Sequence, residues 1–457
     1  MEFLKCAQDS NVSTEECKEY EMNSFAFAGL VLFVSALLAI SSIIHLWRWK
    51  SQQQFAVIFL ISFLTAFPVS GFIHLLRPST DGYFSLHQNG LQYLTTQAAL
   101  MVLGLSVCMT LYYTNLKMPV ITKKVEGYSA RSFPTLMMIA SLPLIALGVF
   151  ANQKLSDAIE LQNFNRVISL SGGNARFAYL AVWGVWGVIF LGSAILEKFL
   201  LPQFGKFVVA GATVILIFQL LNWTGARLAP LIYAGTFIIG NMRHLKSGRR
   251  LLVPMGAVGY LAFAILVTNR RKLGYSGGQS FSFLDILDWE AGRFSILGGS
   301  IWTVDRNGYL FGDSFVFTWN LLTDGIQKLL NIPALLEIGN TQSISQALGY
   351  GLLGSDKVNY IAPGILVEMF LNFGFLGMLL SVFICIFFLG RIQFHYQNSR
   401  DIITKMMNFY FGSSLISCCI LSSSMSILGS FVFNPIPIYL LYIFSRMERS
   451  LTRNVAE

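Results

Sequence analysis

Long stretches of apolar residues recur along the whole chain and are separated mostly by short polar connections. A helix needs about 20 apolar residues to cross the hydrocarbon core of a bilayer. The candidate spans are 24–46, 54–76, 94–114, 133–151, 177–196, 207–223, 228–240, 251–268, 368–390, 405–424 and 427–445. The stretch 228–240 is short, and Pro435 and Pro437 interrupt the last one, so these two have the weakest pattern. The pattern predicts an all-α polytopic membrane protein with about 11 transmembrane helices in a single integral membrane domain, 1–457.

The composition agrees with this pattern. Hydrophobic residues make up 54% of the chain, charged residues only 12%, and the mean hydropathy is +0.60. So few charges cannot cover a protein surface unless much of it faces lipid. These values exclude a water-soluble enzyme, a disordered protein and a secreted disulfide scaffold. The net charge of +9 comes without any Lys/Arg block, so it indicates basic cytoplasmic loops and no nucleic-acid partner.

The distribution of Lys and Arg predicts the orientation. If the N-terminus is outside, the inner connections and the C-terminal tail hold 18 basic residues, whereas the short outer segments hold 7. Because cytoplasmic loops carry the excess of basic residues, we expect an N-out, C-in topology. The segment 269–367, between the eighth and ninth spans, is then one large external loop. A loop of 99 residues is uncommon unless it has a function.

Arginines gather at the expected outer boundary. Arg176 and Arg227 open the fifth and seventh spans, and Arg293 and Arg306 lie in the large loop. The planar guanidinium binds two oxygens of a diphosphate at once and keeps its charge, and it stabilises a phosphate leaving group. The alternative is that an arginine at a span end extends to the lipid headgroups. We expect Arg227, Arg293 and at least one of the other two to converge on one cavity at the outer leaflet.

Other side chains leave two interpretations open. Glu368, at the outer end of the ninth span, would cost energy unless it is paired or faces a cavity, so it has either a functional role or a structural ion pair. Trp302 and other loop aromatics could stack on sugar rings or lie at the membrane interface. The chain has no P-loop, no HExxH and no Cys/His cluster with zinc spacing, so no metal or cofactor is expected. None of the five histidines lies in the loop, which excludes a His-based triad there.

Two segments resemble a known family. A Gly-x-Arg opens the seventh span in GARLAPLIYAGTFIIGNMRHLKSGRR, at 225–250. This resembles the part of O-antigen polymerases in which a Gly-x-Arg opens a membrane helix that ends in a basic inner loop. The segment NYIAPGILVEMFLNFGFLGMLL at 359–380, which runs into the ninth span, resembles the helix after the large periplasmic loop, with its Glu and its Asn-Phe-Gly-x-x-Gly. The order of parts matches over most of 160–390, whereas the first 130 residues match only in hydropathy.

The resemblance implies a Wzy-type polymerase with a glycosyltransferase-C-like helical fold. Such enzymes join oligosaccharide repeat units carried on undecaprenyl diphosphate, at the periplasmic face of the bacterial inner membrane, without a metal or a nucleotide sugar. The product would be O-antigen, a part of lipopolysaccharide, or a related surface polysaccharide. The partners would be the lipid-linked oligosaccharide and membrane lipid, and they could include a chain-length regulator and a flippase of the same pathway.

Site residues follow from matched positions. Arg227 matches the Gly-x-Arg arginine and would hold the diphosphate, and Glu368 and Asn372 match the Asn-Phe-Gly helix. Arg293 and Arg306 fall where the family's loop carries arginines, and Arg176 is a similar, weaker case. The catalytic candidates are Arg227, Arg293 and Glu368, and the substrate-binding candidates are Arg176, Arg306, Asn372, Glu337 and Trp302. The general base stays open between Glu290, Glu337 and Glu368, or the arginines alone suffice.

Three other classes compete with a polymerase. An O-antigen ligase, which transfers glycan to lipid A core, characteristically has a His ahead of the helix that follows the loop, and SDKVNYIAPG has none. A transporter or flippase commonly shows repeated halves and midplane polar sites in broken helices, neither of which the sequence shows. A scaffold protein would not need arginines at one depth on one face.

Overall fold

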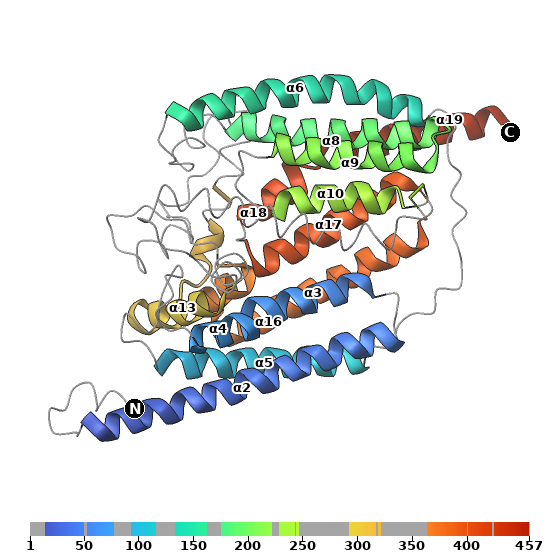
Figure 1. Cartoon of the computed structure of the whole chain (residues 1–457). Helices are drawn as coiled ribbons and strands as arrows, with labels where there is room; N and C mark the ends of the chain where they lie inside the picture. The colour runs from blue at the N-terminus through green and yellow to red at the C-terminus, as the bar shows by residue number, and fades with distance from the viewer. Residues whose placement is uncertain are drawn as a thin grey trace. The chain divides into compact units, whose positions relative to one another are not determined.

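The chain is almost entirely helical in the residues that the computed structural model describes, and no strand occurs among them. These residues are 14–49, 53–76, 93–115, 133–161, 175–221, 228–242, 244–245, 292–316, 319–320, 363–399, 401–422 and 425–456. The helices up to the large loop are α2 (Thr14–Trp49), α3 (Gln54–Leu64), η1 (Thr65–Val69), α4 (Ser70–Leu76), α5 (Tyr93–Asn115), α6 (Phe133–Leu161), α8 (Ala175–Lys198), α9 (Gln203–Leu220) and α10 (Leu228–Gly240). The others are α13 (Phe294–Asn307), α16 (Ile365–Asn398), α17 (Ile402–Ile420), α18 (Met425–Leu428), η4 (Gly429–Phe433) and α19 (Ile436–Ala456), where η marks a π-helix (Figure 1).

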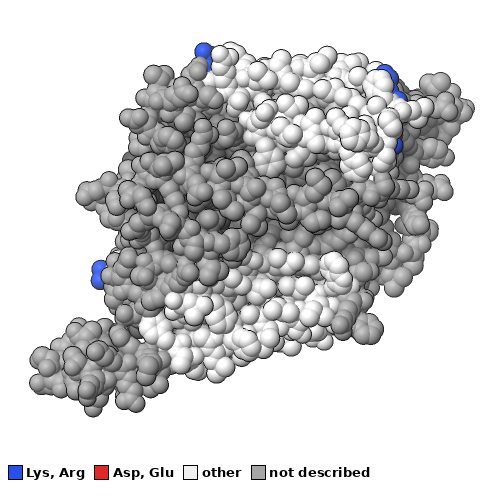
Figure 2. Space-filling model, viewed as in Figure 1, with Lys and Arg blue, Asp and Glu red and all other residues white. Residues whose placement is uncertain are grey.

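Seven of the described helices are long and apolar enough to cross a membrane. They are Ser24–Trp47, Gln54–Leu76, Leu94–Asn115, Pro134–Leu155, Phe177–Lys198, Gln203–Leu220 and Ile365–Asn398. Figure 2 shows that, on the face in view, the described surface is almost free of charged side chains, and its few Lys and Arg lie near the edges. A surface of this kind is solvated by lipid. The prediction of an all-α polytopic membrane protein is therefore confirmed at this level.

Of the remaining predicted spans, some coincide with shorter helices and one lies outside the described residues. The stretch 228–240 forms the short apolar helix α10, and 405–424 largely coincides with α17. The stretch 251–268 and the expected surface helix at 322–338 lie outside the described residues. The count of eleven spans and the N-out, C-in topology stay predictions.

The contacts within the chain divide it into two compact units. Unit 1 comprises 1–119, 280–390 and 415–428, and unit 2 comprises 120–279, 391–414 and 429–457. Helices α16 and α17 each contribute to both. The single membrane domain that the sequence indicates stays a prediction.

In unit 1, α2 and α5 run parallel. The hydroxyl of Thr96 donates to the carbonyl of Ser24 over 3.4 Å, and further along, Ser42 Oγ donates to Thr110 Oγ1 over 3.0 Å. The segment α3–η1–α4 lies between them in the chain and also packs against α2. Because the hydroxyls also bond within their own helices, these polar side chains add interhelical contacts without leaving a donor unsatisfied in an apolar environment.

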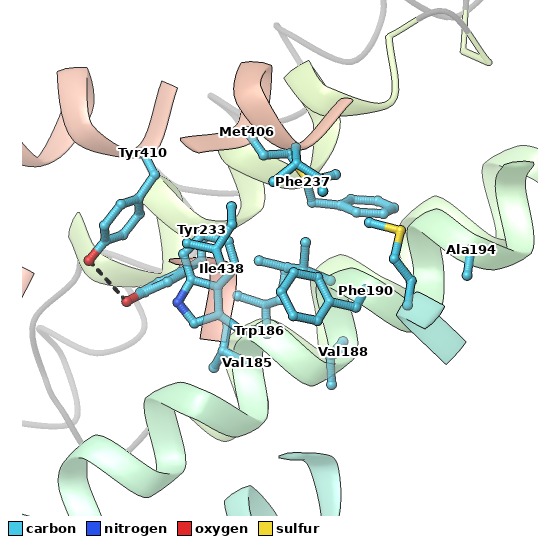
Figure 3. Packing of buried hydrophobic residues seen from close by; sticks show 14 of the residues in the cluster. Val185, Trp186, Val188, Phe190, Ala194, Tyr233, Phe237, Met406, Tyr410 and Ile438 are labelled. Carbon is cyan, nitrogen blue, oxygen red and sulfur yellow. Dashed lines mark hydrogen bonds between the residues drawn. The ribbon is translucent and has the colours of Figure 1, made fainter. Parts of the chain in front are cut away.

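In unit 2, α6 and α8 pack at close range because both carry glycine where they cross. A Cβ on Gly148 would collide with the backbone of Gly184, and the reverse collision also holds. Small residues at such crossings let two membrane helices approach closely. The other face of α8 packs against α9, α10, α17 and α19. Figure 3 shows Trp186 beside Tyr233 and Tyr410 in this core, where the two tyrosine hydroxyls lie 3.3 Å apart.

The last predicted span, 427–445, contains the short apolar stretch Gly429–Ser445, which a turn at Asn434–Pro435 divides into η4 and the start of α19. Proline has no amide hydrogen, so Pro435 and Pro437 cannot donate to the carbonyls four residues earlier. Unit 2 supplies other donors: the Tyr439 hydroxyl to the carbonyl of Phe431 (3.0 Å) and the indole of Trp183 to the carbonyl of Phe433 (2.9 Å). Trp186 bonds the next carbonyl, that of Asn434, over 2.8 Å.

Candidate functional site

Arg293 begins α13 at the centre of unit 1. Residues 292–301 are all buried, so the start of this helix is inserted among α4, η1 and α5. The amide of Arg293 donates to the carbonyl of Ala66 over 2.7 Å. That carbonyl is available because of the π-helix, in which the amide of Ser70 bonds to the carbonyls of Thr65 and Phe67 instead. A local irregularity in one helix thus anchors the start of another.

The position of Ala66 shows how deep α13 reaches. Ala66 lies 12 residues from Gln54 and 10 residues from Leu76, the two ends of the same candidate span. At 1.5 Å per residue these separations are about 18 Å and about 15 Å. The backbone of Arg293 therefore lies near the middle of the span. Although α13 belongs to the predicted external loop, its first turn lies beside the middle of a candidate span.

The guanidinium of Arg293 bonds to the end of another helix. Its Nη2 donates to the carbonyl of Leu421 over 2.9 Å, directly after α17, and its Nη1 donates to the carbonyl of Gly292 over 2.6 Å. The last carbonyls of a helix have no partner within the helix and carry partial negative charge. A cation at this position is therefore stabilised, and it ties α13 to α17.

The start of α16 meets the same end of α17. Gly364 has φ +78°, and a Cβ there would collide with the carbonyl oxygen of Ile420. The amide of Glu368 donates to the carbonyl of Gly364 over 2.9 Å, so Glu368 lies one turn into α16 and is fully buried. Three helix ends thus meet: the starts of α13 and α16 and the end of α17.

Arg293 and Glu368 are exceptional in their burial. Among the side chains that the structure describes, they are the only Lys, Arg, Asp or Glu that are buried, at 7% and 0% exposure. Buried charges cost several kcal/mol each unless they are compensated, and inside a membrane they mark functional sites by default. We take the region where the three helix ends meet as the candidate site of unit 1.

The Asn-Phe-Gly-x-x-Gly sequence is a sharp break in α16. Phe373 and Gly374 leave the helical conformation, with φ +66° at Gly374. A Cβ on Gly377 would collide with the carbonyl oxygen of Met369. In a continuous helix these two residues would be about 12 Å apart along the axis, so the first two turns of α16 fold back against the part of the helix beyond the break. Both glycines are required, one for its φ and one for the close approach.

Asn372, at the break, forms hydrogen bonds with both α16 and the segment 308–314. Its Oδ1 accepts from the amide of Gly312 (2.8 Å), and its Nδ2 donates to Ser314 Oγ and to the carbonyl of Glu368 (both 2.8 Å). The amide of Leu310 donates to the carbonyl of Leu371 over 3.0 Å. The segment 308–314 is thereby fastened to the broken helix. In the structure the amide group of Asn372 makes contacts that position the loop, and its role in substrate binding stays a prediction.

Replacing Asn372 with leucine, which has a similar size and no amide, should release this loop. Three hydrogen bonds would be lost and the amide of Gly312 would lose its partner, each costing about 0.5–1.5 kcal/mol. We expect a lower thermal midpoint in detergent and faster proteolysis within 308–314. Ser381→Ala is the control, because Ser381 is also buried in α16 but bonds only to the carbonyl of Met378 within its own helix. Equal thermal midpoints and equal proteolysis rates in the two variants would contradict the role of Asn372 in holding this segment.

The other predicted site residues lie apart or outside the described residues. Arg306 is in the last turn of α13, 13 residues or about 20 Å from Arg293, where its guanidinium lies 4.4 Å from the ring centroid of Trp302. These two loop arginines therefore do not converge. Arg176 lies in the first turn of α8, in unit 2, and its side chain is not described. Arg227, Glu290 and Glu337 lie outside the described residues, so the expected convergence on Arg227 stays a prediction.

His74 is the residue that sequence reasoning overlooked. It lies in the last turn of α4, is buried at 4% exposure, and its ring centroid is 6.1 Å from that of Phe294, the residue after Arg293. The sequence places no histidine in the large loop, whereas in the structure the second span brings His74 close to α13. Its position inside an apolar span was the available signal, because ionisable residues in spans are rare.

Among the described side chains no three His, Cys, Asp or Glu are grouped to hold a metal ion. A buried guanidinium, a buried carboxylate and a buried imidazole are the groups with acid–base or electrostatic capability. Comparison with known proteins adds no relative, since no family model, curated protein or solved structure matches the chain.

Proposed function

We propose that this membrane-embedded protein is a polymerase that joins undecaprenyl-diphosphate-linked oligosaccharide repeat units into O-antigen or a related polysaccharide. The burial of Arg293 and Glu368 where three helix ends meet in unit 1 carries the proposal. The resemblance of two segments to Wzy-type polymerases supports it, because the Asn-Phe-Gly-x-x-Gly sequence is the break that holds Glu368 and fastens the loop.

The reaction makes distinct demands on the site. The bond between C1 of the growing glycan and its diphosphate oxygen breaks, and the undecaprenyl diphosphate leaves with the electron pair. A hydroxyl at the non-reducing end of a second lipid-linked unit forms the new glycosidic bond and loses its proton. Arg293 would stabilise the diphosphate as its charge develops, and Glu368 would accept the proton. The resemblance assigns diphosphate binding to Arg227 as well. The distribution of basic residues supports a site on the periplasmic side of the bacterial inner membrane.

A transporter is the second candidate, and the structure strengthens it. The sequence shows no broken helix, but α16 is broken at Phe373–Gly374 and η1 interrupts α3–α4 near mid-span. Transporters bind substrates at such discontinuities. A polymerase extends glycans in detergent, where no compartments exist, whereas a transporter does not. Purified protein incubated with lipid-linked repeat units should give a ladder of longer lipid-linked glycans; absence of any ladder with an active lipid-linked substrate would reject the polymerase.

Arg227→Ala should leave the protein folded and in the membrane but abolish long glycan chains, with a single repeat unit left on the acceptor. The reason is the loss of the guanidinium that matches the family's Gly-x-Arg arginine. Chain length on gels of cell-surface glycan is the measurement, and Lys198→Ala, which removes an exposed cation at the end of α8, is the control. Normal long chains in the Arg227 variant would reject its assignment.

A further inference from the structure

A group of exposed aromatic side chains surrounds the break in α16, and the proposed reaction does not yet use it. Phe311 is 77% exposed, Phe373 46% and Tyr309 43%. The rings of Tyr309 and Phe311 lie 6.1 Å apart at 70°, and the tip of the Phe373 ring approaches Gly312. We call Tyr309, Phe311 and Phe373 the aromatic ledge.

The aromatic ledge is held in place by hydrogen bonds between the segment 308–314 and α16, including those of Asn372. The bonds from Leu310 to Leu371 and from Gly312 to Asn372 lie on either side of Phe311. The phenol end of Tyr309 lies against Gly374, in space that any larger residue there would occupy. The ledge is therefore a rigid extension of the broken helix, and through Asn372 it is joined to the turn that carries Glu368.

The backbone of Phe311 is strained, and its exposed side chain gains little packing energy to offset that strain. Its φ is +44°, in the left-handed region that costs a residue with a Cβ about 1–2 kcal/mol. Gly308 and Gly312, on either side, adopt positive φ without this cost. A third glycine would suit the turn better, so the large exposed ring at 311 has a use outside the fold.

The surroundings of the ledge favour a saccharide over a lipid chain. Asp305, Arg306 and Asp313 are all exposed and lie within the same nine residues. Sugar rings present C–H faces that pack on aromatic rings and hydroxyls that bond to carboxylates and guanidinium groups, whereas an acyl or polyprenyl chain gains nothing from charged neighbours. We propose that the aromatic ledge binds a sugar ring of the glycan substrate, with Phe311 as the stacking residue. This inference rests on the proposed function for the identity of its ligand.

Binding and polymerisation can be measured separately. The probe is the single repeat-unit oligosaccharide, released by mild acid from the host strain's own polysaccharide, and its dissociation constant is measured on purified protein in nanodiscs. Phe311→Ala should weaken binding about tenfold, as expected for loss of one stacked ring. Phe311→Tyr should retain binding because it keeps the ring. Phe204→Ala, which removes an equally exposed phenylalanine (79%) from α9, should bind normally.

The outcomes separate the two proposals. Phe311-dependent binding without any polymer from the wild-type protein would support the ledge and reject the polymerase. If polymer forms but the Phe311→Ala variant binds the oligosaccharide as the wild-type protein does, or if the oligosaccharide does not bind at all, the proposal for the ledge is rejected. The proposal of a polymerase is then unaffected. A lipid role would appear as quenching by brominated phospholipids of the added fluorescence in Phe311→Trp, and such quenching without an oligosaccharide effect would also overturn the inference.

Discussion

Arg293→Ala is expected to abolish long glycan chains and to destabilise unit 1. The variant loses the cation that the proposal assigns to the departing diphosphate, and removal of a single electrostatic donor of this kind lowers turnover by about 100–1,000-fold. It also leaves the carbonyl of Leu421 without this donor, at a cost of about 1–3 kcal/mol. The measurements are glycan length and the thermal midpoint of the purified protein.

Arg293→Lys distinguishes the two roles of this side chain. Lysine keeps the charge and loses the planar fork, so it should restore part of the stability but little of the activity if two phosphate oxygens must be held. Lys198→Ala, the exposed cation in unit 2, should change neither quantity. If Arg293→Ala is active at temperatures at which it remains folded, Arg293 only caps α17 and the site assignment is wrong.

Gly364→Ala is expected to prevent correct folding of the site. The substitution combines an unfavourable φ of +78° with a collision between the new Cβ and the carbonyl oxygen of Ile420, which is backbone and cannot rotate away. Strain alone costs about 1–3 kcal/mol, and the collision forces α16 away from the end of α17. We expect loss of the monodisperse peak in size-exclusion chromatography, or a large drop in the thermal midpoint.

Substitutions at two other glycines separate the effect of the unfavourable φ from the effect of the collision. Gly308 has the same φ of +78°, a ψ of −176° and open space around it, so Gly308→Ala reports backbone strain without a collision. Gly211, inside α9, has neither problem, so Gly211→Ala should be neutral or slightly stabilising. The order of stability should therefore be Gly211→Ala, then Gly308→Ala, then Gly364→Ala. An equal effect of the last two would show that the contact with α17 is unimportant.

Hydropathy predicted most of the fold because a bilayer imposes one rule on every span: its backbone must be satisfied internally, and its exterior must be apolar. It did not predict how side chains satisfy the backbone where a helix is interrupted. The stretch 427–445 reads as one apolar span, yet Pro435 and Pro437 divide it, and the tyrosine and tryptophans that bond the freed carbonyls come from within unit 2. A partner that is distant in sequence leaves no local pattern.

The site was predicted less completely for a similar reason. Burial of Glu368 could be anticipated from a carboxylate at a span boundary, and Arg293 from arginine chemistry. Nothing in the sequence indicated that α13 reaches mid-span, because this depends on the carbonyl of Ala66 in another helix. For the same reason His74 was assigned to a span and never associated with the loop.

The π-helix η1 also controls which way α4 faces. One additional residue in a helical turn advances every later side chain by about 100° around the axis. With that advance, Gly71 meets the ring of Phe294, and His74 lies close to the same ring. Without it, the end of the second span would present a different stripe of residues to α13. This five-residue irregularity therefore determines which residues of the last two turns of the span, in α4, face the start of α13.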